Sequence, residues 1–327
     1  MRAWRLEDRS GPTGLSLSEL PDPVPGPRDC LVEIAATALN RADLLQTRGH
    51  YPGHDEPAAV PGLEFSGRVL EVGSEVTRFG PGDAVIGLVA EGAWAERIAV
   101  REELLLALPP AADLVAAGGI AETALTVHDA LRRQGGLGPG RTALVHAGSS
   151  GIGSAAPAIA RELGARIALT VSTRKRELVA TRGADLLIDY ETEDVPARVR
   201  EWTEGRGVDV VLDTLGGGAL ADNQRCLAHR GTMVVIGLLA GARGELDLGR
   251  LLTGRQHLIG SVLRSRSLEE KAALVAEFEA ELGGALRAGR LAPLVDSVLP
   301  FARLPEGLER MRRREHCGKI VVDVAGS

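Results

Sequence analysis

The stretch LVHAGSSGIGSAA, residues 144–156, decides how the rest of the chain is interpreted. An apolar segment runs into glycines and serines, and Gly151 to Ala156 fit the pattern G-x-G-x-x-A. In a strand–turn–helix unit the first glycine permits a tight turn, the second lets the backbone approach a pyrophosphate, and the small residue allows close helix–strand packing. The N–H groups at the start of the helix would bind the phosphates. The stretch therefore predicts a dinucleotide-binding turn.

The flanking sequence favours this interpretation over the alternative, a glycine-rich turn without a ligand. From about Leu114 onward strand-like and helix-like segments alternate, which predicts βαβ units on a parallel sheet. The expected strands lie at 142–147, 166–171, 184–189, 208–214, 232–238 and 257–263. Pro157 is tolerated only in a first helical turn, so we expect the helix to begin near Gly153 or to be distorted locally.

Length and composition are typical of a globular protein with two domains. A chain of 327 residues is too long for one ordinary core. The net charge of −6 gives no electrostatic basis for binding nucleic acid or anionic membranes. The cysteines Cys30, Cys226 and Cys317 are far apart, which favours a reducing compartment over a disulfide framework. With no segment suited to a signal peptide or a membrane helix, we expect a cytoplasmic protein.

The two ends of the chain differ in character from its middle. Eleven of the 17 prolines lie at or before Pro110, among short β-branched runs separated by Gly/Pro turns. This pattern predicts an irregular β-rich domain. After residue 263 an amphipathic helix and two short strand-like runs follow, and we infer that this tail returns to the first domain.

The residues after the second expected strand predict which dinucleotide binds. An NAD-preferring domain usually carries an acid about 20 residues past the first glycine. Here the strand ends at Val171 and is followed by Ser172, Thr173, Arg174 and Lys175. Two hydroxyls and two cations could bind a 2′-phosphate through charge-assisted bonds, which favours NADPH. The alternative is that these cations, with Arg176, form a solvated helix start.

Seven stretches carry a resemblance to a known family. They are LNRADLLQTRGHYP (39–52), PGLEFSGRV (61–69), AETALTVHDAL (121–131), HAGSSGIG (146–153), DTLGG (213–217), VLRSR (262–266) and GKIVV (318–322). In this order they resemble the zinc-free quinone oxidoreductases of the medium-chain dehydrogenase/reductase superfamily, and most of all the tumour-suppressor-inducible branch. The resemblance implies an α/β fold: a Rossmann parallel-sheet domain at 122–263, and a β-rich GroES-like catalytic domain built from 1–121 and 264–327.

The resemblance also implies site residues. Asn40 and Tyr51 would line the nicotinamide and substrate cleft, with Tyr51 able to donate a hydrogen bond or proton to the acceptor oxygen. Thr126 would lie near the carboxamide and Tyr190 near the 2′-phosphate. The candidate catalytic residues are Tyr51, Asn40, Asp43 and Thr126. The candidate cofactor contacts are Asn40, Thr126, Gly148, Ser150, Gly151, Ile152, Gly153, Ser172, Arg174, Lys175, Tyr190, Gly237, Leu263 and Lys319.

Simpler structural roles compete with several of these assignments. Asn40 and Asp43 could merely cap the helix that follows them. Thr126 could be a helical surface hydroxyl. Glu64 is expected to be structural rather than catalytic, and Cys317 a packed thiol rather than a reactive one.

The metal ligands of the zinc-dependent relatives are missing. Those relatives carry a cysteine in the segment aligned with 40–43 and a histidine at the position of Leu63. No cysteine lies between Cys30 and Cys226, so the four-cysteine cluster of a structural zinc is absent too. A second possible ligand set is His50, His54, Asp55 and Glu56. Pro52 and Gly53 lie between the two histidines and prevent a regular helix that would align them. We expect no metal.

Without a Lewis acid, quinones and α,β-unsaturated carbonyls are the expected hydride acceptors, because the resulting oxyanion is delocalised. The predicted function is therefore an NADPH-dependent quinone reductase. An enoyl-thioester reductase and an NADPH-binding protein with a structural or sensing role remain as alternatives. The last expected strand of the central sheet leaves an edge that needs pairing, so we expect a homodimer.

The absent ligands generate the first prediction. Elemental analysis of the purified protein is expected to find no stoichiometric metal. About one zinc per chain, removed by a chelator together with the activity, would contradict it.

Overall fold

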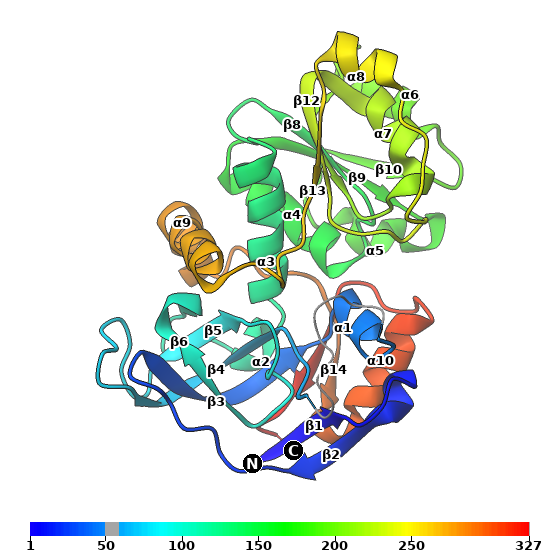
Figure 1. Cartoon of the computed structure of the whole chain (residues 1–327). Coiled ribbons are helices and arrows are strands. Elements are labelled where there is room, and N and C mark those ends of the chain that lie inside the picture. The colour runs from blue at the N-terminus through cyan, green and yellow to red at the C-terminus, as the bar shows by residue number, and fades with distance from the viewer. Residues whose placement is uncertain (50–58, 327) are drawn as a thin grey trace. The chain divides into compact units, whose positions relative to one another are not determined.

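The computed structural model describes residues 1–49 and 59–326 of the chain (Figure 1). The chain forms two compact units, one from 1–123 with 264–327 and the other from 124–263. In the described part of the chain, no helix is both long and apolar enough to cross a membrane.

The second unit is built on a six-stranded sheet in which every pair is parallel. Its strands are β8 (Thr142–Val145), β9 (Arg166–Val171), β10 (Leu186–Asp189), β11 (Val208–Asp213), β12 (Leu227–Val235) and β13 (His257–Gly260). Their order is β10-β9-β8-β11-β12-β13, so the chain moves outward from β8 in one direction and then returns to extend the other side. This is the doubly wound order of dinucleotide-binding sheets, and the predicted strand–helix alternation is confirmed.

Helices connect these strands and cover the sheet. They are α3 (Ala121–Val127), which continues into a π-helical segment η3 (His128–Gln134), then α4 (Gly151–Glu162), α5 (Arg176–Ala180), α6 (Val195–Trp202), α7 (Leu220–Cys226) and α8 (Leu248–Gly254), with the short turns η4 (Thr173–Lys175) and η5 (Gly217–Ala219). Helices α6 and α7 bury Val199 and Cys226 against the sheet, while α4 and α5 lie on its other side (Figure 1). Helix α4 begins at Gly151, two residues earlier than expected, and continues through Pro157.

The first unit contains a seven-stranded sheet and a two-stranded one. Its strands are β1 (Arg2–Leu6), β2 (Leu15–Glu19), β3 (Asp29–Ala38), β4 (Glu64–Val72), β5 (Ala84–Leu88), β6 (Arg97–Arg101), β7 (Leu105–Ala107), β14 (Val295–Pro300) and β15 (Lys319–Asp323). The large sheet has the order β14-β15-β3-β4-β5-β7, with β6 also paired to β3, and β1 pairs with β2. The C-terminal segment therefore returns to the N-terminal sheet through β15.

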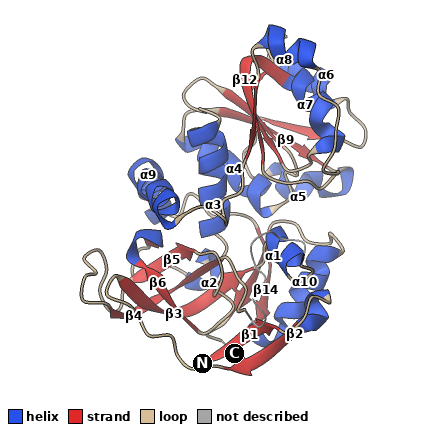
Figure 2. Cartoon of the chain, viewed as in Figure 1, coloured by secondary structure: helices blue, strands red, loops and turns tan. Residues whose placement is uncertain are grey.

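Four helices and a hydrophobic core that draws on both ends of the chain belong to the described part of this unit. The helices are α1 (Arg41–Gln46), α2 (Leu114–Ala117), α9 (Leu268–Arg287) and α10 (Leu304–Arg312), with the turns η1 (Gly11–Gly14), η2 (Glu102–Leu104) and η6 (Phe301–Arg303). Figure 2 shows how strands dominate this unit. Its core packs Trp94 and Phe65 with Phe301 and Leu308 from the returning segment. The large sheet therefore cannot complete its core without the C-terminal residues.

The pairing register of β3, β4 and β15 brings three distant segments together. Thr37 of β3 is opposite Phe65 of β4, and Ala38 is opposite Val321 of β15. Because both pairs are antiparallel, the end of β3 meets the start of β4 and the start of β15. Asn40, Glu64 and Lys319 are therefore brought to one end of the sheet.

Candidate functional site

A buried ion pair lies at this end of the sheet. Lys319 is 3% exposed and Glu64 is 0% exposed, and the Lys319 Nζ lies 2.7 Å from Glu64 Oε1. The same ammonium donates to the Leu39 carbonyl at 3.0 Å and to Asn40 Oδ1 at 2.7 Å. All three of its protons thus have acceptors within the protein. We therefore interpret Lys319 as a residue that positions Asn40 and Glu64 rather than as a cofactor contact.

Glu64 extends the connections to a fourth segment. Its Oε1 also accepts from Asn40 Nδ2 at 2.9 Å, and its Oε2 accepts from the backbone N–H of Glu122 at 3.0 Å. The Asn40 amide thus has its oxygen on an ammonium and its nitrogen on a carboxylate, which fixes its orientation. A Cβ on Gly119 would lie 3.1 Å from Lys319 Cε, so this glycine leaves space for the lysine side chain. The expected structural role of Glu64 agrees with this geometry.

Asp43 lies beside this cluster in the first turn of α1. Its Oδ2 accepts the backbone N–H of Asn40 at 2.6 Å, so Asp43 does cap the helix, as the alternative to a functional role supposed. The carboxyl is fully buried, and its Oδ1 has no hydrogen-bond partner within residues 1–49 and 59–326. Burial raises the pKa of Asp43 to about 7, although the Asn40 bond and the charges of Lys319 and Arg264 act in the opposite direction. The side chain is therefore poised to gain or lose a proton near neutral pH.

In the second unit, the glycine-rich turn follows β8 directly. The Gly148 N–H donates to the Thr170 carbonyl at 2.8 Å, which holds the turn against β9. Ala147 has a φ of 55°, a left-handed conformation that costs an alanine roughly 1 kcal/mol or more and is concentrated at functional sites. A Cβ on Gly153 would lie 2.4 Å from the Ala147 carbonyl oxygen, so only glycine fits there. Sequence reasoning gave no signal for the strain at Ala147.

The start of α4 has the donors that an anion needs. Ser150 caps the helix by accepting the Gly153 N–H at 3.0 Å. In the described part of the chain, no acceptor is recorded for the N–H groups of Gly151 and Ile152. Unpaired N–H groups at a helix start, with the positive end of the helix dipole, bind phosphate. The turn therefore fits a dinucleotide pyrophosphate.

The residues after β9 have mixed environments. Ser172 is buried, Arg174 is exposed and Lys175 is half-buried. The Thr173 hydroxyl donates to Asp189 Oδ2 at 2.6 Å, and this bond is the main cause of a lowered pKa at Asp189. Arg176 pairs with Glu193 at 3.2 Å. Asp189 ends β10 and Glu193 lies four residues beyond it, so both acids come from a neighbouring segment that spacing along the sequence does not reveal.

A buried polar cluster lies next to the glycine-rich turn, and sequence reasoning did not predict it. His146 bonds through Nδ1 to Thr170 Oγ1 at 3.0 Å and through Nε2 to Asn223 Oδ1 at 2.6 Å. Burial lowers the pKa of His146 and raises the pKa of Asp213, which accepts the backbone N–H groups of Leu215 and Gly216. An uncharged imidazole therefore links β8, β9 and α7 beneath the turn. The only sequence signal was a histidine at the end of an apolar strand.

The remaining candidates have ordinary surroundings or lie outside the described residues. Tyr190 is 54% exposed, and Thr126 is half-buried on α3. A Cβ on Gly237 would lie 2.9 Å from the Thr214 carbonyl oxygen, so the ends of β11 and β12 approach closely there. Leu263 follows β13, and Cys317 is a buried thiol. Tyr51 falls outside the described residues, as do His50, His54, Asp55 and Glu56.

Metal ligands do not cluster in the described ranges. Within 1–49 and 59–326, no group of three or more His, Cys, Asp or Glu side chains is arranged to hold a metal ion. The expectation of a metal-free protein stays a prediction.

Family models match both units. The alcohol dehydrogenase GroES-like domain matches residues 26–128, and the zinc-binding dehydrogenase model matches residues 151–279. The chain belongs to the medium-chain dehydrogenase/reductase superfamily, as the resemblance predicted.

Individual relatives cover nearly the whole chain. Quinone oxidoreductase-like protein 2 homolog of Nematostella vectensis is 27% identical over 294 residues, 89% of this chain and 80% of that protein. A synthase of Mycobacterium tuberculosis, phthioceranic/hydroxyphthioceranic acid synthase, is 32% identical over 92% of this chain, which spans 14% of that protein.

Solved structures share the complete fold. Escherichia coli quinone oxidoreductase complexed with NADPH has a TM-score of 0.86 and 27% identity, over 99% of this chain and 100% of that one. A probable oxidoreductase from Mycobacterium abscessus has a TM-score of 0.83 and 31% identity, over 99% of each chain. The predicted class, a Rossmann-type parallel sheet with a GroES-like β-rich part, is confirmed.

The buried ion pair generates a stability prediction. Lys319→Met is expected to lower the free energy of unfolding by about 3–5 kcal/mol, because Glu64 is left as an uncompensated buried charge. The double variant Lys319→Met with Glu64→Gln should lose less free energy of unfolding than the two single variants lose together. Arg2→Met is the control, since Arg2 and Glu96 also lie 2.7 Å apart but are 38% and 30% exposed, and it should cost about 1 kcal/mol or less. Urea unfolding of the native protein, the two single variants, the double variant and the control measures these effects, and additive losses of unfolding free energy would contradict the account.

Asp43 generates a pH prediction. A carboxyl whose pKa is raised from its ordinary value near 4 to about 7 contributes stability below pH 4 that is lost as the pH rises through 7. Relative to Asp43→Asn, the native protein should therefore lose up to about 4 kcal/mol of unfolding free energy between pH 4 and pH 7. Urea unfolding at a series of pH values tests this, and a difference independent of pH would contradict it.

Proposed function

We propose that the protein is an NADPH-dependent oxidoreductase that reduces quinones or related α,β-unsaturated carbonyls without zinc. The observation that carries this proposal is the donor-rich turn at the start of α4, followed after β9 by Ser172 and the cations Arg174 and Lys175. The likeness to a quinone oxidoreductase solved with NADPH supports it. In this proposal 124–263 bind the dinucleotide, while 1–123 and 264–327 supply the catalytic side chains.

The chain's own residues would bind and orient the cofactor. The Gly151 and Ile152 N–H groups would hold the pyrophosphate, and Arg174 and Lys175 would bind the 2′-phosphate. The bound nicotinamide supplies a hydride to an acceptor held close to it. Residues at the end of β3 would then handle the proton and the developing negative charge.

Two buried groups suit that second task in different ways. Asn40 is held in one orientation by Lys319 and Glu64, so it contributes a fixed dipole. Asp43 has a pKa of about 7 and one oxygen without a partner in the described residues, which suits a proton reservoir at neutral pH. Tyr51 remains the proposed direct donor to the acceptor oxygen.

The residues at the positions of the relatives' zinc ligands favour hydride acceptors that need no Lewis acid. Leu63 stands where the zinc-dependent relatives carry a histidine, and its neighbour Glu64 is neutralised by Lys319. Quinones and enones accept a hydride readily because the product charge is delocalised. Simple ketones and aldehydes benefit more from a metal ion.

An enoyl-thioester reductase is the second candidate. The 32% identity to part of a synthase named for an acid product favours it. It needs the same hydride chemistry on a conjugated carbonyl, so the two candidates differ in the acceptor alone.

The proposed partner is a second copy of the chain. Strand β13 is an edge of the parallel sheet, and it exposes Leu258, with Leu248, Leu252 and Val262 exposed nearby in sequence. An unpaired edge with apolar side chains is suited to pairing with an identical edge. We propose a cytoplasmic homodimer built on this strand.

The cation pair predicts cofactor preference. NADPH should bind at least roughly tenfold more tightly than NADH, about 1.4 kcal/mol. Lys175→Ala should erode this preference and leave NADH binding nearly unchanged. Arg176→Ala is the control, because its guanidinium already pairs with Glu193. Titration calorimetry measures the dissociation constants, and equal values for the two cofactors in the native protein would refute the assignment.

The acceptor is tested by turnover. NADPH consumption is compared for a quinone panel and crotonyl thioesters, and Tyr51→Phe should lower kcat with quinones about 10- to 1000-fold while cofactor binding changes little. An unchanged kcat would make Tyr51 part of the pocket wall. Faster turnover of the thioesters would favour the second candidate. NADPH binding without turnover of any acceptor would favour a binding protein.

A further inference from the structure

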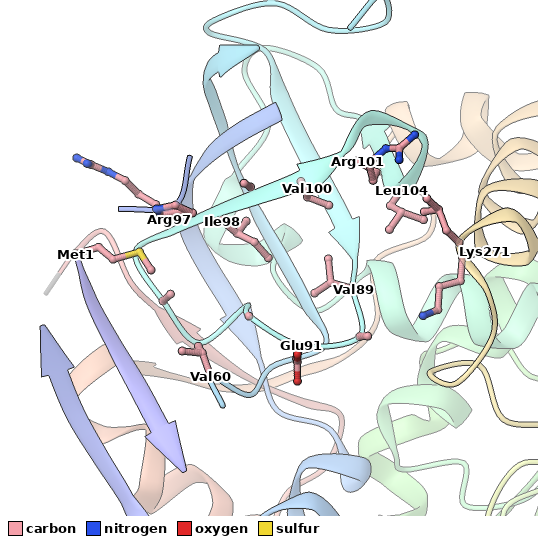
Figure 3. A pocket seen from close by; sticks show the side chains of 16 residues that line it. Met1, Val60, Val89, Glu91, Arg97, Ile98, Val100, Arg101, Leu104 and Lys271 are labelled. Carbon is pink, nitrogen blue, oxygen red and sulfur yellow. The ribbon is translucent and has the colours of Figure 1, made fainter. Parts of the chain in front are cut away.

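A pocket of about 460 Å³ lies within the first unit, away from the residues assigned above. Its walls come from β6, from the segment 89–92 and from the start of α9 (Figure 3). The lining is mostly apolar and includes Val60, Val89, Ile98 and Leu104. Sites for small organic ligands have this size and this predominance of apolar surface.

One buried cation faces this apolar space. Lys271 lines the pocket, and its side chain reaches from α9 toward the segment that carries Val89 and Glu91 (Figure 3). It is 7% exposed, and its Nζ donates to the Arg264 carbonyl at 2.7 Å. Among the described residues no carboxylate forms a salt bridge with it. Burial and the charge of Arg264 lower the pKa of Lys271.

Composition and helix position make this lysine unusual. The chain holds 38 basic residues, of which three are lysines, at 175, 271 and 319. Lys319, the other buried lysine, has a carboxylate partner, whereas within residues 1–49 and 59–326 the Lys271 ammonium bonds to a carbonyl and forms no salt bridge. Lys271 is also the fourth residue of α9, close to the end of the helix where the dipole disfavours a cation. A buried charge under these conditions is costly unless something compensates it.

Among the described residues, no acid around the pocket forms a salt bridge with Lys271, although the charge of its neighbour Glu270 acts to raise the pKa of the lysine. Arg97 pairs with Asp22, and Arg101 pairs with Glu103 and lies near Asp29. Glu91 is the acidic residue of the lining, and it is exposed to solvent. The pocket therefore combines apolar walls with a lysine that forms no salt bridge among the described residues.

We propose that this pocket binds an amphipathic carboxylate, with its hydrocarbon chain along β6 and the segment 89–92 and its carboxylate on Lys271. This site goes beyond the proposed reductase activity, which does not require it. A charge-assisted bond to Lys271 would supply the missing counter-ion, and the chain would displace water from the apolar walls. Two hydrogen bonds connect the pocket to residues near the candidate site. Val89 donates its N–H to the Leu63 carbonyl at 2.8 Å, next to Glu64, and Lys271 bonds to Arg264, whose charge lowers the pKa of Asp43.

The test is a binding series on the full native chain without cofactor. Decanoate, decanol and decylammonium share one chain length and differ in head group, and titration calorimetry gives their dissociation constants. Decanoate should bind at least tenfold more tightly than decanol, and decylammonium should bind more weakly than either. Equal affinities for decanoate and decanol, or no binding of decanoate, would overturn the proposal.

Variants locate the binding. Lys271→Met should abolish the tenfold preference for decanoate over decanol. Arg287→Met is the matched control, since it removes one charge from the same helix at an exposed residue, and it should retain the preference. Ala90→Phe, which narrows the pocket at a half-buried residue, should weaken decanoate and decanol together and decides the question if Lys271→Met fails to fold. Undiminished decanoate binding in Ala90→Phe, or in a folded Lys271→Met protein, would place the ligand elsewhere.

Discussion

The buried contact between Lys319 and Glu64 is the constraint on which the first unit, residues 1–123 with 264–327, depends. It joins the end of β3, the start of β4, the start of α3 and the start of β15 through bonds made by two side chains. Neither charge can be left alone in an interior of low dielectric, so the four segments must meet before either is stable. The return of the C-terminal residues to the first sheet is therefore an electrostatic requirement as well as a matter of packing.

The same contact sets the character of the candidate site. The ammonium of Lys319 neutralises Glu64, and the two side chains together orient the amide of Asn40 through its oxygen and its nitrogen. Asp43 lies in the same buried surroundings and has no ion pair in the part of the chain that the structure describes, and its carboxyl consequently favours the protonated form up to about pH 7. A rigid dipole and a neutral acid are suited to a reaction that develops an oxyanion and then needs a proton.

Much of the fold could be predicted from sequence, because its signals are local. The strand–turn–helix at 142–156 and the alternation after it define the parallel sheet, and short Gly/Pro-punctuated strands define the other unit. The site was harder to predict because its partners are distant: Lys319 lies 255 residues from Glu64. His146 and Ala147 carried no pattern that could reveal a buried hydrogen-bond cluster or a strained backbone. Asp189 reaches Thr173 through the pairing of β9 with β10, which spacing along the chain does not encode.

The central claim, that the chain transfers a hydride from NADPH to a conjugated acceptor, is tested most directly by isotope transfer. The native protein is mixed with NADPH carrying deuterium at C4 and an α,β-unsaturated ketone, and the product is analysed by mass spectrometry and NMR. The account predicts deuterium on the β-carbon of the reduced product, from one face of the nicotinamide only. A reduced product that carries no deuterium, whichever C4 hydrogen of NADPH is labelled, would contradict it. So would NADPH that binds and is not oxidised by any enone or quinone.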